Sequence, residues 1–173
     1  MGLKNLLIQK KATILKRWFD MILETYPPDA AEFFKQKDNR FANPVGYTIL
    51  REIESLYGEL LEGVNAEKIS PFLDRIIRIR AVQDFSPSEA IAFVYSLKKV
   101  VRVELEREIL ENRLYEDLLK FESRIDELAL CAFDIYMKCR EKIYEIRVDE
   151  VKNRTFSLLK RANLIGDISE AEG

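Results

Sequence analysis

The acidic side chains suggest the first candidate chemistry, because four glutamates gather in one short segment. They are Glu104, Glu106, Glu108 and Glu111. Clustered carboxylates are the ligands that Ca²⁺ and Mg²⁺ prefer. Arg102, Arg107 and Arg113 alternate with them, and opposite charges at helical spacing pair with one another on a solvated surface. We therefore interpret this segment as a salt-bridged helix face, with a metal site as the alternative.

Three arginines near the end of a predicted helix suggest a second chemistry, the binding of an anion. Arg75, Arg78 and Arg80 lie close together in the sequence, and guanidinium groups pair well with carboxylates and phosphates. The alternative is that these charges only flank an apolar stripe, and Asp84 could cap the corner or hold one of the arginines. We take Asn43, Arg78, Arg80 and Asp84 as a candidate corner for a partner or a ligand.

Catalytic and cofactor motifs are missing from the sequence. The chain has no histidine, which removes the commonest general base and the commonest metal and haem ligand. It also lacks HExxH, CxxC, GxSxG and glycine-rich phosphate-loop patterns, and its six glycines are scattered. We predict that the protein is not an enzyme and has no catalytic residues, no metal and no cofactor.

Two cysteines could carry redox or metal chemistry, but their spacing argues against it. Cys131 and Cys139 lie in a predicted helix, where eight residues separate them by about 12 Å, too far for a disulfide. We interpret them as small apolar residues. The alternative for the whole chain is a ligand-binding helical domain in which Met137 or a cysteine ligates haem or a small molecule.

Composition limits the possible partners and location. The 173 residues are 47% hydrophobic, enough for one domain with a core, and 34% charged with a net charge of −2. The mixed charges give no basis for nucleic-acid binding. No apolar run reaches the roughly 20 residues that span a bilayer, and the N-terminus lacks a cleavage pattern. We expect a cytoplasmic protein without membrane insertion.

The elements that must position these residues all read as helices. Helix starts are predicted at Asp29, at Asn43-Pro44 and at Ser86-Pro87, where capping side chains precede apolar residues at helical spacing. Pro71 marks either a start or a kink. The predicted helices cover about 7–22, a short stretch after 29, 44–63, 69–83, 87–111 and 115–162.

The predicted fold class is therefore all-α, a compact globin-like or bundle domain of about six helices with a long C-terminal helix. We expect one domain over residues 1–163 and a disordered tail over 164–173.

The last predicted helix carries a possible dimer seam. It would be about 70 Å long, which exceeds the diameter of a domain of this size, so it either kinks or extends and pairs with something. Apolar residues recur along it with spacings of 4, 3, 4, 3 and 4, as in a coiled coil. They are Phe121, Ile125, Leu128, Ala132, Ile135 and Cys139. We expect a homodimer through this seam.

Three segments carry a resemblance to a known family. The first runs from Arg78 to Ala90, RIRAVQDFSPSEA, and is followed by Phe93 and Leu97-Lys98; the others are FANPVG at 41–46 and FDIYM at 133–137. Together they resemble the N-terminal domain of RsbRD-type co-antagonists of the RsbT kinase, a group of bacterial signalling proteins.

The resemblance implies a helical sensory or regulatory module. In RsbR-type relatives this domain is similar to a globin without haem, dimerises, and passes a signal along its C-terminal helix to a STAS domain. The present sequence ends at Gly173 without STAS strands, so we expect a stand-alone regulatory domain. It would act by binding a partner protein or a small ligand, and the resemblance does not identify the signalling partner.

Overall fold

The computed structural model describes residues 2–35, 42–83 and 85–162. The chain divides into two compact units, Met1–Met137 and Lys138–Gly173. The first unit contains the core and every other helix, and the described part of the second is the end of the last helix. The expected single domain over 1–163 remains a prediction, and the tail predicted over 164–173 lies outside the described residues.

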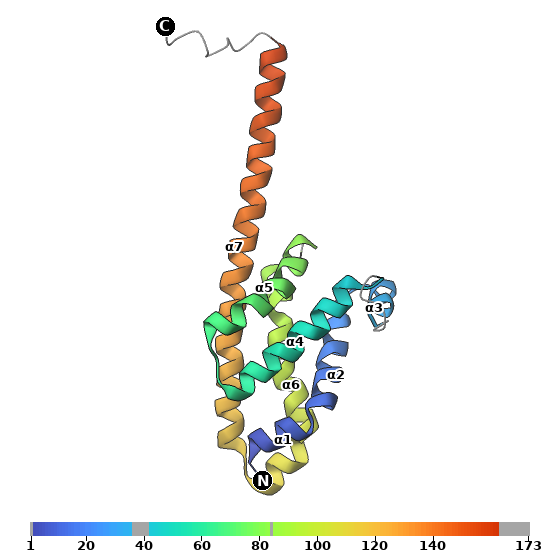
Figure 1. The fold of residues 1–173 in the computed structure, drawn as a ribbon, viewed down its shortest axis with the longest axis vertical. Coiled ribbons are helices and arrows are strands. Elements are labelled where there is room, and N and C mark those ends of the chain that lie inside the picture. The colour runs from blue at the N-terminus through green and yellow to red at the C-terminus, as the bar shows by residue number, and fades with distance from the viewer. Residues whose placement is uncertain (1, 36–41, 84, 163–173) are drawn as a thin grey trace. The chain divides into compact units, whose positions relative to one another are not determined.

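The described residues form seven helices and no strand, so the predicted all-α fold with a long final helix is confirmed (Figure 1). The globin-like arrangement remains a prediction. The helices are α1 (Leu3–Gln9), α2 (Lys11–Leu23), α3 (Pro28–Lys35), α4 (Pro44–Glu62), α5 (Ala66–Val82), α6 (Pro87–Asn112) and α7 (Tyr115–Arg161).

Two predicted helix starts are confirmed. The Asn43 side chain accepts a hydrogen bond from the Gly46 N–H at 2.9 Å, and Pro44 fills the first helical position of α4. Ser86 and Glu89 form a reciprocal capping box at the start of α6. The predicted boundary after α6 is also confirmed, because Arg113 adopts a left-handed conformation with φ 55°.

Three boundaries differ from the prediction. The first predicted helix is two helices, interrupted at Lys10, whose ammonium donates to the Glu104 carbonyl at 2.7 Å. Helix α3 begins at Pro28, whose missing N–H suits the first position, so Asp29 lies in the first turn and is not the cap. Helix α5 begins at Ala66 with Asn65 as its cap, so Pro71 lies inside the helix.

The core of the first unit forms where α2 packs against α4 and α6, and α4 against α5 (Figure 1). Trp18 of α2 is fully buried, stacks on Phe93 with ring centroids 6.4 Å apart, and donates its indole N–H to the Phe93 carbonyl at 2.7 Å. Tyr57 of α4 is also buried and donates to the Leu7 carbonyl at 2.9 Å. These bonds satisfy the polar atoms of large core side chains.

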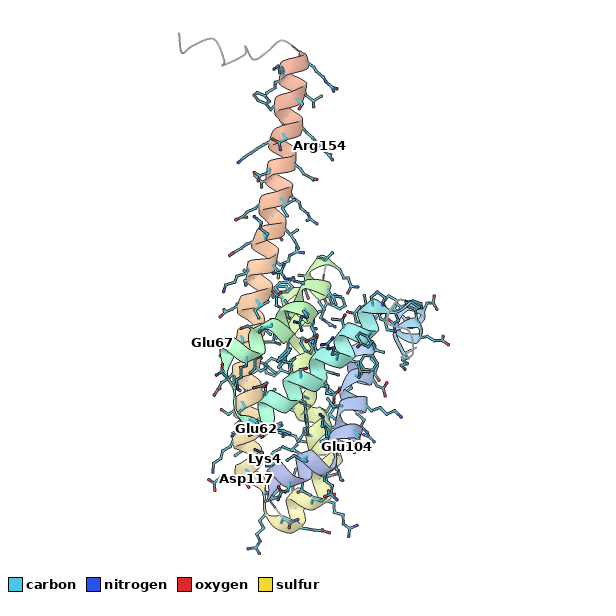
Figure 2. The ribbon with its side chains drawn as sticks, in the orientation of Figure 1. Lys4, Glu62, Glu67, Glu104, Asp117 and Arg154 are labelled. Carbon is cyan, nitrogen blue, oxygen red and sulfur yellow. The ribbon has the colours of Figure 1, made fainter. Side chains whose placement is uncertain are left out.

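Near the surface, ion pairs join elements distant in sequence. Lys4 of α1 lies 2.9 Å from Glu62 at the end of α4 (Figure 2). Both side chains are exposed, so the pair contributes little to stability. Within the described ranges, no helix is both long and apolar enough to cross a membrane.

The capping box predicts a pH-dependent contribution to stability. The Glu89 carboxylate accepts from the Ser86 hydroxyl at 2.6 Å and the Ser86 N–H at 2.9 Å, which lowers the pKa of Glu89 below its ordinary value of 4.5. The ionised carboxylate therefore stabilises the folded protein at pH values above the pKa that Glu89 has in the unfolded state. This stabilisation is lost as the pH falls through the lower pKa that Glu89 has in the folded state.

We therefore expect Glu89→Gln to destabilise the protein at neutral pH and to have a progressively smaller effect below about pH 4. Urea unfolding of both proteins at a series of pH values measures the difference. A difference that stays constant down to the acid limit of folding would contradict a role for the carboxylate charge.

Candidate functional site

Arg80, near the end of α5, forms the centre of the candidate site. Its side chain is fully buried, and its Nη2 atom donates to Thr25 Oγ1 at 3.1 Å and to the Glu89 carbonyl at 3.0 Å. Three aromatic rings surround the guanidinium, with centroids at 4.2 Å for Phe85, 5.5 Å for Tyr26 and 5.8 Å for Phe93. Such rings stabilise a cation through their electron-rich faces.

The guanidinium nevertheless keeps unpaired donors. Among the described residues, its buried Nε and Nη1 atoms have no acceptor within hydrogen-bond geometry, and neither has the buried Tyr26 hydroxyl a partner, although that hydroxyl is close enough to interact electrostatically with the guanidinium. Among the residues that the structure describes, no carboxylate forms an ion pair with Arg80. Burial lowers the pKa of Arg80, although Tyr26 and Glu89 oppose this effect. A buried charge without a counterion costs several kcal/mol, so this arrangement needs an explanation.

A cavity of about 430 Å³ adjoins this cluster, between the end of α2, helix α3 and the α5–α6 corner. Its size suits a small molecule. The rings of Phe34 and Phe85 meet Tyr26 edge-on, at centroid distances of 5.2 and 5.3 Å. The residues that line it are Tyr26, Pro27, Ala30, Phe34, Gln83, Phe85 and Glu89. Three of these seven residues are aromatic, and one, Glu89, carries a carboxylate.

The same corner is tied to α7. Tyr136 of α7 is buried and donates its hydroxyl to the Phe85 carbonyl at 2.5 Å. Phe85 thus lines the cavity, covers Arg80 and holds the α5–α6 corner against the last helix of the first unit.

The predicted corner residues are only partly brought together. Asn43 is buried and donates to the Phe34 carbonyl at 2.8 Å, so it positions one residue of the cavity wall without lining the cavity. Arg78 lies on the exposed face of α5 and pairs with Asp74 at 2.6 Å. Asp84 lies outside the described residues.

The sequence reasoning did not find the role of the aromatic residues around Arg80. A signal was present, because the buried stripe of α5 places Arg80 four residues after Ile76 and seven after Leu73. A charge at a stripe position is unusual and predicts a special environment. Arg75, by contrast, is explained by its two bonds to the buried Glu52 carboxylate, at 2.9 and 2.8 Å.

The predicted dimer seam needs correction. Phe121, Ile125, Leu128 and Ala132 are buried within the single chain, so they are unavailable to a second copy of this fold. The reason is that a 4-3 spacing describes any packed helix face, including one that packs on its own domain. Ion pairs from Arg102 to Glu122 and from Lys98 to Asp126 fasten the same stretch of α7 to α6. Ile135 and Cys139 are half-buried.

The glutamate-rich segment forms ion pairs, as predicted, but two of them reach residues outside the segment, and Arg102 pairs instead with Glu122 of α7. Glu104 pairs with Arg17, Glu108 pairs with Lys10 at 2.6 Å, and Glu111 pairs with Arg107 at 2.7 Å. In the part of the chain that the structure describes, no group of three potential ligands is placed to hold a metal ion.

The fold and site thus define an all-helical domain with a long last helix and a buried cationic corner beside a cavity. Residues 12–151 match the family model of the RsbT co-antagonist protein RsbRD N-terminal domain. The chain belongs to this family of regulatory domains, which confirms the resemblance found in the sequence.

The chain is also similar to a protein of Archaeoglobus fulgidus. This uncharacterized protein is 32% identical to the chain over 138 residues, which cover 79% of this chain and 82% of that protein. No solved structure matches the chain.

Proposed function

We propose that this protein is a non-enzymatic cytoplasmic regulatory domain that acts through protein–protein contacts. Its first partner is a second copy of the same chain, held by the end of α7. Membership of a regulatory-domain family supports the general role. The observation that carries the proposal is an exposed apolar seam on α7 after residue 138.

This seam, which we call the α7 seam, consists of Tyr144, Val148, Val151 and Leu158. Their spacings are 4, 3 and 7, with Thr155 at the intermediate position, so they share one face of the helix. Their exposed fractions lie between 49% for Val148 and 64% for Leu158. Figure 2 shows the side chains near Arg154 extending outward from the helix.

A second copy is the occupant that this pattern favours. A seam with coiled-coil spacing is complementary to itself, because each knob fits a hole formed by the same residues of an identical helix. Burying a Val or Leu side chain contributes about 1.5–3 kcal/mol, so several such residues per helix can hold a dimer. The RsbR-type domains that this chain resembles also dimerise.

We expect the wild-type protein to be a dimer and Val151→Glu to weaken dimerisation at least about tenfold, because two glutamates would face each other across the seam. Ile146→Glu is the matched control. Ile146 is equally apolar and 52% exposed on the same helix, but it lies off the seam and should leave the dimer intact. Sedimentation velocity measures the association.

A monomeric wild-type protein, or equal dissociation in both variants, would contradict the α7 seam. Circular dichroism of each variant shows whether the helices are retained, which separates loss of pairing from loss of folding.

A further inference from the structure

Arg80 carries two buried nitrogen atoms that have no acceptor among the described residues. The guanidinium has five N–H donors, and within the described part of the chain only Nη2 has acceptors. The surrounding rings of Tyr26, Phe85 and Phe93 stabilise the charge but accept no conventional hydrogen bond. Other arginines of the first unit with carboxylate partners, such as Arg75 and Arg102, keep their guanidinium groups about half or more exposed. Arg80 is thus distinctive in being buried without a carboxylate among the described residues.

The adjoining cavity shares three wall residues with Arg80. Tyr26 and Phe85 cover the guanidinium and also line the cavity, and the Glu89 carbonyl accepts from Arg80 while Glu89 lines the cavity edge. Arg80 itself does not line the cavity, and the half-buried Phe85 ring lies over its guanidinium, so contact with a ligand in the cavity requires this ring to move aside.

We propose that this cavity binds a small monocarboxylate with an apolar or aromatic body, whose carboxylate pairs with Arg80. The inference deepens the regulatory role proposed above and rests on it for its biological meaning. The binding itself does not depend on the α7 seam, so the two proposals can fail separately.

Charge and lining select this class of ligand. One buried cation neutralises one negative charge, and the Glu89 carboxylate at the cavity edge disfavours a ligand with two. A phosphate dianion therefore fits less well than a carboxylate. The rings of Tyr26, Phe34 and Phe85 favour a flat or apolar body over a sugar or a polar chain.

The test is isothermal titration of the wild-type protein with benzoate and phenylacetate, and with benzamide as the neutral control. We expect both acids to bind, and benzamide to bind roughly tenfold to hundredfold more weakly, because the charge-assisted bond to the guanidinium is lost. Arg80→Leu should abolish the preference for the acid.

A second pair of variants tests the cavity without changing Arg80, whose substitution could also affect folding. Ala30→Trp places a large side chain in the cavity and should abolish binding of both acids. Ala31→Trp makes the same change at the next residue of α3, which does not line the cavity, and should leave binding unchanged.

Three outcomes would overturn the proposal. Equal affinity for benzoate and benzamide would show an apolar pocket without a role for Arg80. The same titration is made with Asp84→Asn. If this variant binds the acids and the wild-type protein does not, the chain's own Asp84 carboxylate is the counterion of Arg80 in the wild type. If neither the wild-type protein nor Asp84→Asn binds the acids, buried water is the acceptor for the Arg80 donors.

Discussion

Replacing Trp18 with alanine is expected to lower the free energy of unfolding by about 4 kcal/mol. The indole is fully buried between α2 and α6 and stacks on Phe93. Its removal leaves a cavity that the surrounding helices cannot fill, and it also removes the hydrogen bond to the Phe93 carbonyl. Urea unfolding followed by far-ultraviolet circular dichroism measures the loss, because Trp18 is the only tryptophan and fluorescence is lost with it.

One further variant tests the hydrogen bond at this position, and a second, at an exposed position of α6, is the control. Trp18→Phe keeps an aromatic ring but removes the N–H donor. The Phe93 carbonyl also accepts from Ser96 Oγ at 2.6 Å, so the lost bond itself should cost only about 1 kcal/mol. Tyr95→Ala, on the exposed side of α6, should change stability by less than about 0.5 kcal/mol. A loss below 1 kcal/mol for Trp18→Ala would contradict the packing of α2 against α6.

Gly46→Ala is expected to cost at least about 2 kcal/mol, although alanine normally favours a helix. A Cβ at this position would lie 2.5 Å from the Phe34 carbonyl oxygen and 2.6 and 2.7 Å from the side-chain nitrogen and oxygen of Asn43. These atoms belong to the hydrogen bonds that join α3 to the start of α4. The methyl group would therefore force apart the contact that positions Phe34 in the cavity wall.

Gly58→Ala is the matched control in the same helix. A Cβ there meets no atom within 4 Å, so the variant should be more stable than wild type by about 0.5–1 kcal/mol through helix propensity. Thermal unfolding of both variants gives the comparison. Equal effects of the two substitutions would show that α3 does not approach α4 as closely as the structure places it.

Local signals in the sequence determined much of the helical architecture. The cap at Asn43 and the capping box at Ser86 were predicted correctly, because each depends on side chains that bond to amides within the same turn. Family membership could also be recognised, because its motifs are continuous segments of the chain. The break at Lys10 was not predicted, and no capping residue marks it in the sequence, since the side chain of Lys10 bonds to Glu104 of α6 and not to its own helix.

The sequence predicted the candidate site only in part. Local chemistry alone identified the types of residue that could bind an anion and the helix on which they lie. Which arginine is buried was decided by tertiary packing, since the rings around Arg80 come from Tyr26, Phe85 and Phe93 on separate elements.

The last helix shows the same division. Apolar spacing by itself determined that α7 is a long helix with packed faces, because the 3.6-residue period is a local property of the backbone. The spacing is equally compatible with packing on the chain's own core and on a second copy. Only the tertiary structure decided that Ile125 and Leu128 face the core while Val148 and Val151 remain exposed, because burial depends on which other helices are present to cover each face.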